Sequence, residues 1–135
     1  MEPTHFEWKK EYSVNVELFD AQHQMLIKTI DDLYQAIAKG EGKEFLEKVF
    51  NNLNLYANKH FSDEEKYFKE FNYPEAEMHI ALHEKFKKDI LEMEAKAVSE
   101  ASSFEILFFL ENWWVNHIMD VDKRYSEFFN KHGLK

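Results

Sequence analysis

Apolar residues recur every three or four positions along most of the chain, which is the spacing of one face of an α-helix. Two clusters of helix-breaking residues, "GEG" at 40–42 and "NYPE" at 72–75, interrupt this periodicity. The pattern predicts four helices, over about 20–39, 43–71, 74–98 and 102–131. Because the connections between them are short, successive helices should run antiparallel. The predicted fold is all-α, an antiparallel up-down-up-down four-helix bundle.

The first 17 residues lack helical periodicity, and "YSVNV" at 12–16 alternates as an extended segment does. We expect residues 1–17 to form an extended N-terminal arm, which Trp8 and Tyr12 anchor against a bundle of residues 18–135. A chain of 135 residues with 44% hydrophobic content suits a single domain with one sizeable core.

Composition narrows the function classes. A formal net charge of -9 repels phosphate backbones and anionic lipid headgroups, so we expect no nucleic-acid partner. The absence of cysteine excludes disulfides and thiolate metal sites. The longest uninterrupted apolar run, "ILFFL" at 106–110, is far below the roughly 20 residues that span a bilayer. Since the N-terminus also lacks a signal-peptide layout, we expect a cytoplasmic protein without membrane insertion.

Polar side chains interrupt the apolar stripes of all four predicted helices. His23 fills the gap between Phe19 and Leu26 in the first stripe. Two pairs, His60 with Glu64 and His79 with His83, are spaced four residues apart, which places the members of each pair on one helix face. The interrupting residues are His23, His60, Glu64, His79, His83 and His117. A single core histidine is usually a structural, hydrogen-bonded group. Five of them indicate a site if they meet.

The antiparallel arrangement predicts that they do meet. At a rise of 1.5 Å per residue, His23 and His60 both lie about 25 Å from the first turn. Glu64 lies about 8 residues before the second turn, and His79 and His83 follow that turn at similar distances. His117 is level with His83 across the third turn. The sequence therefore places five imidazoles and at least two carboxylates in one slab of the core.

Such a slab requires cations, because an unpaired buried carboxylate costs several kcal/mol. The stripes carry no Lys or Arg, so metal ions are the expected partners. Five imidazoles are too many for one ordinary site, whereas two carboxylates that each bridge two metals complete two sites. One metal would then be held by three histidines and the other by two. With a bridging oxide or hydroxide, the first metal is six-coordinate and the second is five-coordinate. The open position on the latter is where a small ligand would bind.

Ligand chemistry favours iron, although zinc, manganese and copper accept similar ligands. Ferritin-like di-iron oxidases use Glu-x-x-His pairs and carboxylate-rich sites, and the predicted helices contain no such pair. A nitrogen-rich ligand set stabilises high-valent iron less well, so we expect it to hold dioxygen rather than cleave it.

Five motifs together make the chain resemble a hemerythrin of the bacterial single-domain type. They are Trp8 in the arm, "FDAQH" at 19–23, "HFSDEE" at 60–65, "HIALH" at 79–83 and "HIMDVD" at 117–122. The resemblance implies a non-haem di-iron centre that binds dioxygen end-on and reversibly at the two-histidine iron. It implies that His79, His83 and His117 hold one iron, that His23 and His60 hold the other, and that Glu64 and Asp122 bridge them beside an oxo or hydroxo group.

The spacing around His117 leaves a conflict. On an ideal helix Asp120 lies about 60° from His117 and Asp122 about 140°, so geometry alone favours Asp120. The family spacing favours Asp122. Choosing Asp122 predicts a local distortion between residues 117 and 122, of the π type that brings positions i and i+5 together.

Supporting residues follow from the same resemblance, beside an ordinary role in core packing. We expect Leu26, Phe61, Trp113 and Trp114 to line an apolar ligand pocket and Tyr125 to lie next to the metal ligands. Gln22 and the acidic residues around Glu64 read as solvated helix surface. Trp114 is a departure, because relatives carry an aliphatic residue at this position.

The leading hypothesis is a dioxygen carrier, store or local supplier that is not an enzyme and that serves an oxygen-recipient protein of unknown identity. A di-iron peroxidase or a nitric-oxide-handling enzyme could use the same open position. A sensor or iron-buffering module is a third alternative.

Overall fold

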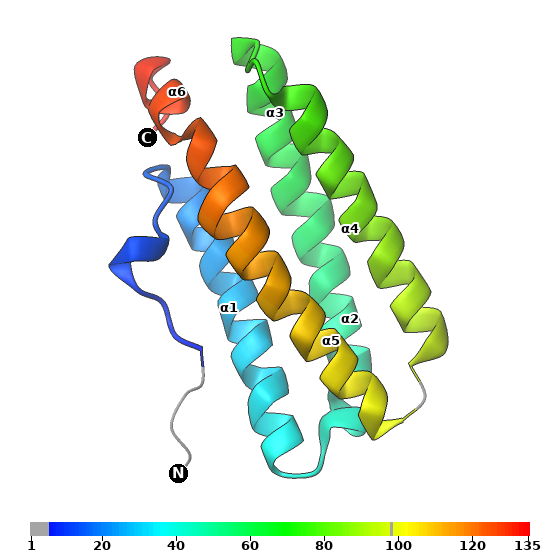
Figure 1. The fold of residues 1–135 in the computed structure, drawn as a ribbon. Helices are drawn as coiled ribbons and strands as arrows, with labels where there is room; N and C mark the ends of the chain where they lie inside the picture. Colours follow the sequence, from blue (N-terminus) through cyan, green and yellow to red (C-terminus); the bar gives the residue numbers. More distant parts are fainter. Residues whose placement is uncertain (1–5, 98) are drawn as a thin grey trace.

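The computed structural model describes residues 6–97 and 99–135, and within these ranges it is helical with no strand. The α-helices are α1 (Glu17–Ala38), α2 (Gly42–Tyr56), α3 (Ser62–Phe71), α4 (Ala76–Lys96), α5 (Glu100–Trp113) and α6 (Ser126–Lys131). In the described chain they form four antiparallel rods, α1, α2 with α3, α4, and α5 with α6 (Figure 1). The predicted up-down-up-down bundle is confirmed.

Two of the rods contain turns that are not α-helical. The π-helical segment η2 (Ala57–Phe61) joins α2 to α3. The π-helical segment η3 (Trp114–Val121) and the 3₁₀ segment η4 (Asp122–Tyr125) join α5 to α6. The predicted distortion between residues 117 and 122 is therefore confirmed, whereas the sequence did not predict η2. Such π turns concentrate at functional sites in helices.

Helix boundaries differ from the prediction by a few residues. The first helix begins at Glu17 rather than at about Asp20, because Asp20 already donates its backbone N–H to Val16 as part of the helix. The Asp20 carboxylate instead accepts hydrogen bonds from the Val14 backbone N–H at 2.8 Å and the Ser13 hydroxyl at 2.6 Å. The predicted end of the third helix at residue 98 lies outside the described residues.

The arm lies alongside the bundle, as expected for its described part. Val14 and Val16 are fully buried, and the Tyr12 ring packs edge-on against Trp114 at 5.1 Å between ring centroids. The Trp8 ring in turn packs against Tyr12 at 5.8 Å. A 3₁₀ turn, η1 (Lys10–Tyr12), interrupts the extended segment that the sequence predicts. The first five residues of the predicted arm lie outside the described ones.

The buried apolar side chains fall into two clusters, and polar residues separate them. The larger fills the bundle between the helices, from Leu26 to Ile118, while the smaller joins the arm to the last turns of α3 and α6. The Phe68 ring of the smaller cluster contacts His79, and the Phe61 ring of the larger contacts His83. The histidines therefore lie between two apolar layers.

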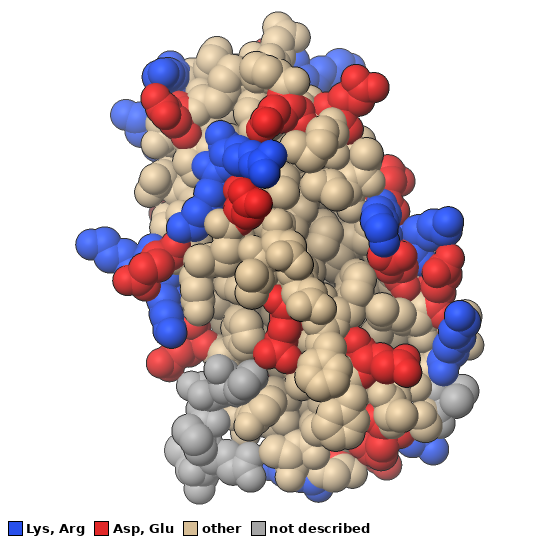
Figure 2. Space-filling view, viewed as in Figure 1, with Lys and Arg blue, Asp and Glu red and all other residues tan. Residues whose placement is uncertain are grey.

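Figure 2 shows Lys and Arg mixed with Asp and Glu over the visible face, with uncharged surface between them. None of the described helices has the length and apolar character that crossing a bilayer requires. Three acidic side chains are buried in the described chain. Asp31 accepts a hydrogen bond from the Phe6 backbone N–H at 3.0 Å, and the other two, Glu64 and Asp122, belong to the cluster described next.

We predict that Gly42→Ala destabilises the fold, although alanine is the better helix former by about 1 kcal/mol. A Cβ at this position would lie 2.5 Å from Ser103 Oγ and 2.8 Å from Ile37 Cγ1, so the first turns of α2 and α5 would have to separate. Overpacking of this kind costs about 1–3 kcal/mol, which should appear as a fall of several degrees in Tm. Glu44→Ala on the exposed side of the same turn is the control. An unchanged Tm for Gly42→Ala would mean that this contact is loose.

Candidate metal centre

All seven predicted ligands meet in the core, in two overlapping groups. In each group every residue offers one ligand atom, and these atoms lie within 4.8 Å of one another. The first group is Glu64, His79, His83, His117 and Asp122, and the second is His23, His60, Glu64 and Asp122. Every member is buried, with at most 3% of its surface exposed. The sharing of both carboxylates is what two neighbouring cations with common bridges require.

Glu64 turns one oxygen toward each group. Its Oε1 lies 3.0 Å from His83 Nε2, and its Oε2 lies 3.2 Å from His60 Nε2. Glu64 is one helical turn after His60, so the pair stands on one face of the rod.

Asp122 divides its oxygens in the same way. Its Oδ1 lies 2.8 Å from His79 Nε2 and 3.0 Å from His117 Nε2, and its Oδ2 lies 3.0 Å from His23 Nε2. The two carboxylates thus span both groups from opposite helices, as bridging ligands do.

Several ligand atoms at the centre converge without a hydrogen-bond partner. Both oxygens of Asp122, Glu64 Oε1 and His83 Nε2 are buried and lack a hydrogen-bond partner, despite separations near 3 Å. Pairs of imidazole Nε2 atoms also approach to 3.1 Å, between His23 and His60 and between His79 and His117. No Lys or Arg is buried anywhere in the described chain. These converging lone pairs suit bound metal ions, and no buried Lys or Arg of the described chain stands where such ions would bind.

The electrostatics keep both carboxylates ionised, which is the form that binds metal. Burial alone would raise the pKa of Glu64, but the imidazoles of His60, His79 and His83 hold it well below its usual range. Burial and the charge of Glu64 both raise the pKa of Asp122. His117 and His23 lower it by more than this, so the net pKa of Asp122 is well below its usual range.

The π-helical segment η3 decides which aspartate joins the centre. Asp122 is fully buried beside His117, whereas Asp120 is exposed and pairs with Arg124 at 3.3 Å. The ideal-helix geometry that favoured Asp120 fails, because η3 brings the residue five positions after His117 onto its face.

Gln22 holds one of the histidines from outside, so the prediction that it is surface is wrong. Its side chain is 7% exposed, and its Oε1 accepts a hydrogen bond from His60 Nδ1 at 2.5 Å. Its amide nitrogen donates to Asp63 Oδ2 at 2.7 Å, which fixes the orientation of the amide. Because His60 Nδ1 carries the proton, His60 Nε2 keeps its lone pair for a metal.

Glu65 plays the same part for His83, and the prediction of a solvated acid holds only in part, because the side chain is 27% exposed but pairs with His83. His83 Nδ1 donates to Glu65 Oε2 at 2.9 Å. Such outer carboxylates raise the basicity of a ligand imidazole and fix its ring. The only signal in the sequence is adjacency, since Gln22 precedes His23 and Glu65 follows Glu64.

Tyr125 lies next to the centre, as expected. Its hydroxyl donates to Glu64 Oε2 at 2.5 Å. Burial, followed by the charges of Asp122 and Glu64, raises the pKa of Tyr125 well above its ordinary value, so the phenol remains a donor. The Glu64 carboxylate is therefore oriented by a hydrogen bond from a neutral phenol.

Aromatic rings cover both halves of the centre. Phe61 stacks on His83 with 3.8 Å between centroids, and Trp113 stacks on His117 at 3.9 Å, so two of the four predicted pocket residues contact the three-histidine half. Trp114 and Tyr56 cover the other half. The Trp114 indole approaches His23 edge-on at 6.1 Å, and Tyr56, which the sequence did not single out, stacks on His60 at 5.0 Å. Leu26 is buried in the same apolar cluster as these rings.

Comparison with known proteins gives a consistent picture. The model of the hemerythrin HHE cation binding domain matches residues 14–129. The chain is 30% identical over 124 residues to a myohemerythrin of Theromyzon tessulatum, covering 92% of this chain and 93% of that protein. It is 34% identical over 99 residues to a bacteriohemerythrin of Campylobacter jejuni, covering 73% and 72%. The crystal structure of a point mutant of a hemerythrin superposes with a TM-score of 0.77 at 26% identity, covering 93% of this chain and 97% of that one.

We predict that Gln22→Leu weakens metal binding at the two-histidine half by about 10–100-fold, since it removes the acceptor for His60 Nδ1. Competition against a chelator, followed by metal analysis, measures the loss. Gln24→Leu, an exposed position on the same helix, is the matched control. Equal metal retention by the two variants would show that the Gln22 contact is incidental.

Proposed function

The chain belongs to the hemerythrin family, and from this premise we propose that it binds dioxygen reversibly at a non-haem di-iron centre. His79, His83 and His117 would hold one iron, and His23 and His60 the other. Glu64 and Asp122 would bridge the two ions beside an oxide or hydroxide. The protein would act as a carrier, store or local supplier of dioxygen.

The observation that carries this proposal is the asymmetry between the two groups. Both share the same two carboxylates, but one group has three imidazoles and the other has two. The ion with fewer ligands has a coordination position to offer, so a small ligand would bind on the His23 and His60 side. When bound, the iron pair supplies the electrons that hold dioxygen.

The protein supplies confinement and orientation. The rings over His60 and His117 and the indole beside His23 exclude water from the centre. Exclusion of water slows the conversion of the iron pair to an oxidised dead-end form. The imidazole-rich ligand set favours binding over oxygen cleavage, because di-iron oxidases in four-helix bundles use carboxylate-rich sites. We therefore propose a binding role rather than a catalytic one.

We predict that the purified protein contains two irons per chain and shows a visible absorption band that appears under air and disappears under nitrogen. Metal analysis and anaerobic spectrophotometry measure both quantities on one sample. One zinc per chain would contradict the di-iron centre, and catalytic oxygen consumption with substrate turnover would contradict the binding role.

We predict that Trp114→Leu speeds dioxygen dissociation by about tenfold, because the indole is 2% exposed and covers the His23 side of the centre. Tenfold corresponds to a barrier change of about 1.4 kcal/mol, within the range expected when buried aromatic area is removed. Stopped-flow measurement of oxygen release gives the rate constant. Val115→Ala, on the exposed side of the same segment, should leave the rate unchanged. If both variants release oxygen at the native rate, the indole does not control ligand exchange.

A further inference from the structure

The hydroxyl of Tyr56 is a buried donor without an acceptor. Tyr56 is the last residue of α2 and is 7% exposed, and its hydroxyl proton has no acceptor in the described structure. Buried hydroxyl groups almost always have a partner, and an unpaired one lowers stability. The position therefore calls for an acceptor that the protein itself does not supply.

The phenol lies over the two-histidine half of the centre. Its ring stacks on His60 with 5.0 Å between centroids and 22° between planes. The hydroxyl is also within electrostatic range of Asp122 and Glu64. The unpaired donor is thus on the side where the ligand count leaves a position open.

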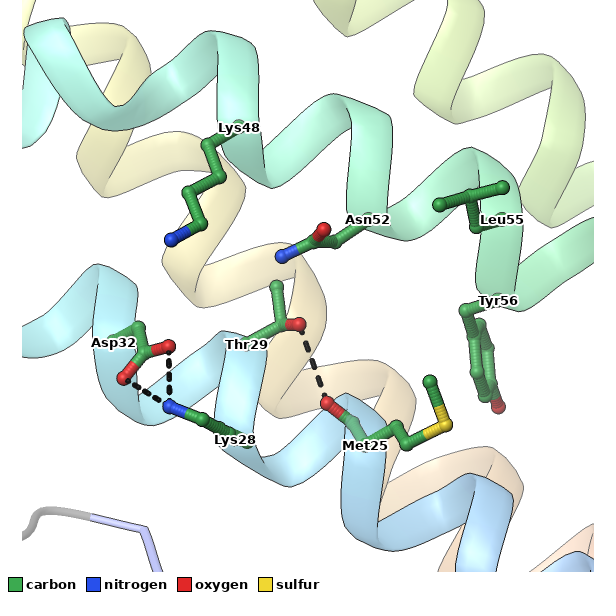
Figure 3. Close-up of a pocket in the computed structure, with 8 residues that line it drawn as sticks. All are labelled: Met25, Lys28, Thr29, Asp32, Lys48, Asn52, Leu55 and Tyr56. Carbon is green, nitrogen blue, oxygen red and sulfur yellow. Dashed lines mark hydrogen bonds and ion pairs between the residues drawn. The ribbon is translucent and has the colours of Figure 1, made fainter.

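Groups on the outer side do not use this hydroxyl. A surface pocket of about 230 Å³ between α1 and α2 ends at Tyr56 (Figure 3). Lys28 and Asp32 in this pocket pair with each other at 3.0 Å. Figure 3 shows the phenolic oxygen pointing away from them and from the other polar residues of the pocket, Thr29, Lys48 and Asn52. The hydroxyl is therefore turned away from the polar wall of the pocket.

The contacts of Tyr125 and Trp113 show which hydrogen bond remains open to the Tyr56 hydroxyl. The Tyr125 hydroxyl is committed to Glu64 Oε2, so it is not available to a ligand. Trp113 Nε1 is also buried, and it faces the Tyr56 phenol as a hydrogen-bond donor. An indole N–H can only donate, so it favours the orientation in which the Tyr56 oxygen faces it and the hydroxyl proton points elsewhere.

We infer that the Tyr56 hydroxyl donates a hydrogen bond to the small ligand bound on the His23 and His60 side of the centre. The inference rests on the proposed function for the location of the open position. The ligand class is a small molecule or anion that presents a hydrogen-bond acceptor, such as dioxygen or azide. Tyr56 is then a ligand-contacting residue that slows release.

Tyr56→Phe tests this by removing the hydroxyl alone while keeping the ring on His60. We expect dioxygen dissociation from the reduced iron-loaded protein to become about tenfold faster, and azide affinity of the oxidised iron-loaded protein to fall about tenfold. Tyr67→Phe removes a phenol oxygen from the other apolar cluster and should change neither quantity. Native values for both ligands in Tyr56→Phe would overturn the inference.

Thermal unfolding separates a ligand-binding role from a structural one. In iron-loaded, ligand-free protein the hydroxyl has no partner, so Tyr56→Phe should keep or raise Tm. Saturating azide should then raise Tm more in the native protein than in the variant. A lower ligand-free Tm together with an equal azide increment would assign the hydroxyl to the fold and overturn the inference.

A measurement on the native protein decides the matter if the variant does not load iron. The infrared stretch of bound azide should shift between H₂O and D₂O, because the donor proton exchanges, and the absence of a shift would overturn the inference. An azide effect of Tyr56→Phe without any reversible oxygen adduct would overturn the proposed function alone, since the donor would still face the open position.

Discussion

Two buried carboxylates with no buried Lys or Arg beside them in the described chain are the constraint on which the rest of this structure depends. Glu64 and Asp122 are fully buried, and each presents its two oxygens to different sets of imidazoles. Neutral histidines can orient such carboxylates but cannot cancel their charge. The core is therefore built around two places where a cation belongs, and the bundle supplies the ligands from all four rods.

The helices depart from regularity where the ligands require it. His60 lies in η2 and His117 in η3, and the second of these segments is what brings Asp122 inward in place of Asp120. A π turn gives up regular helical hydrogen bonding, so its presence in both rods marks a local conflict between helix formation and ligand placement. Packing resolves the conflict, because apolar clusters on both sides and the arm over Trp114 hold the distorted segments in place.

The sequence predicted the bundle and the meeting of the ligands because both depend on periodicity. Apolar spacing defines the rods, and residue rise alone puts His23, His60, His83 and His117 at one level. Periodicity fails where side-chain reach or backbone irregularity matters. Gln22 lies outside the apolar stripe in the sequence and is therefore predicted to be surface, yet its amide oxygen accepts a hydrogen bond from His60 Nδ1. The spacing of His60 and Glu64 suits a regular helix, so η2 had no signature. Tyr56 fits the apolar stripe so well that only its unpaired hydroxyl in the folded protein sets it apart from an ordinary core residue.

We propose that Glu64 and Asp122 each join two metal ions. Anomalous diffraction at the iron absorption edge from crystals of the iron-loaded protein tests it most directly. We expect two iron peaks, one among His79, His83 and His117 and one beside His23 and His60, with both carboxylates bonded to both ions. A single peak, or an Asp120 oxygen in the position assigned to Asp122, would contradict it.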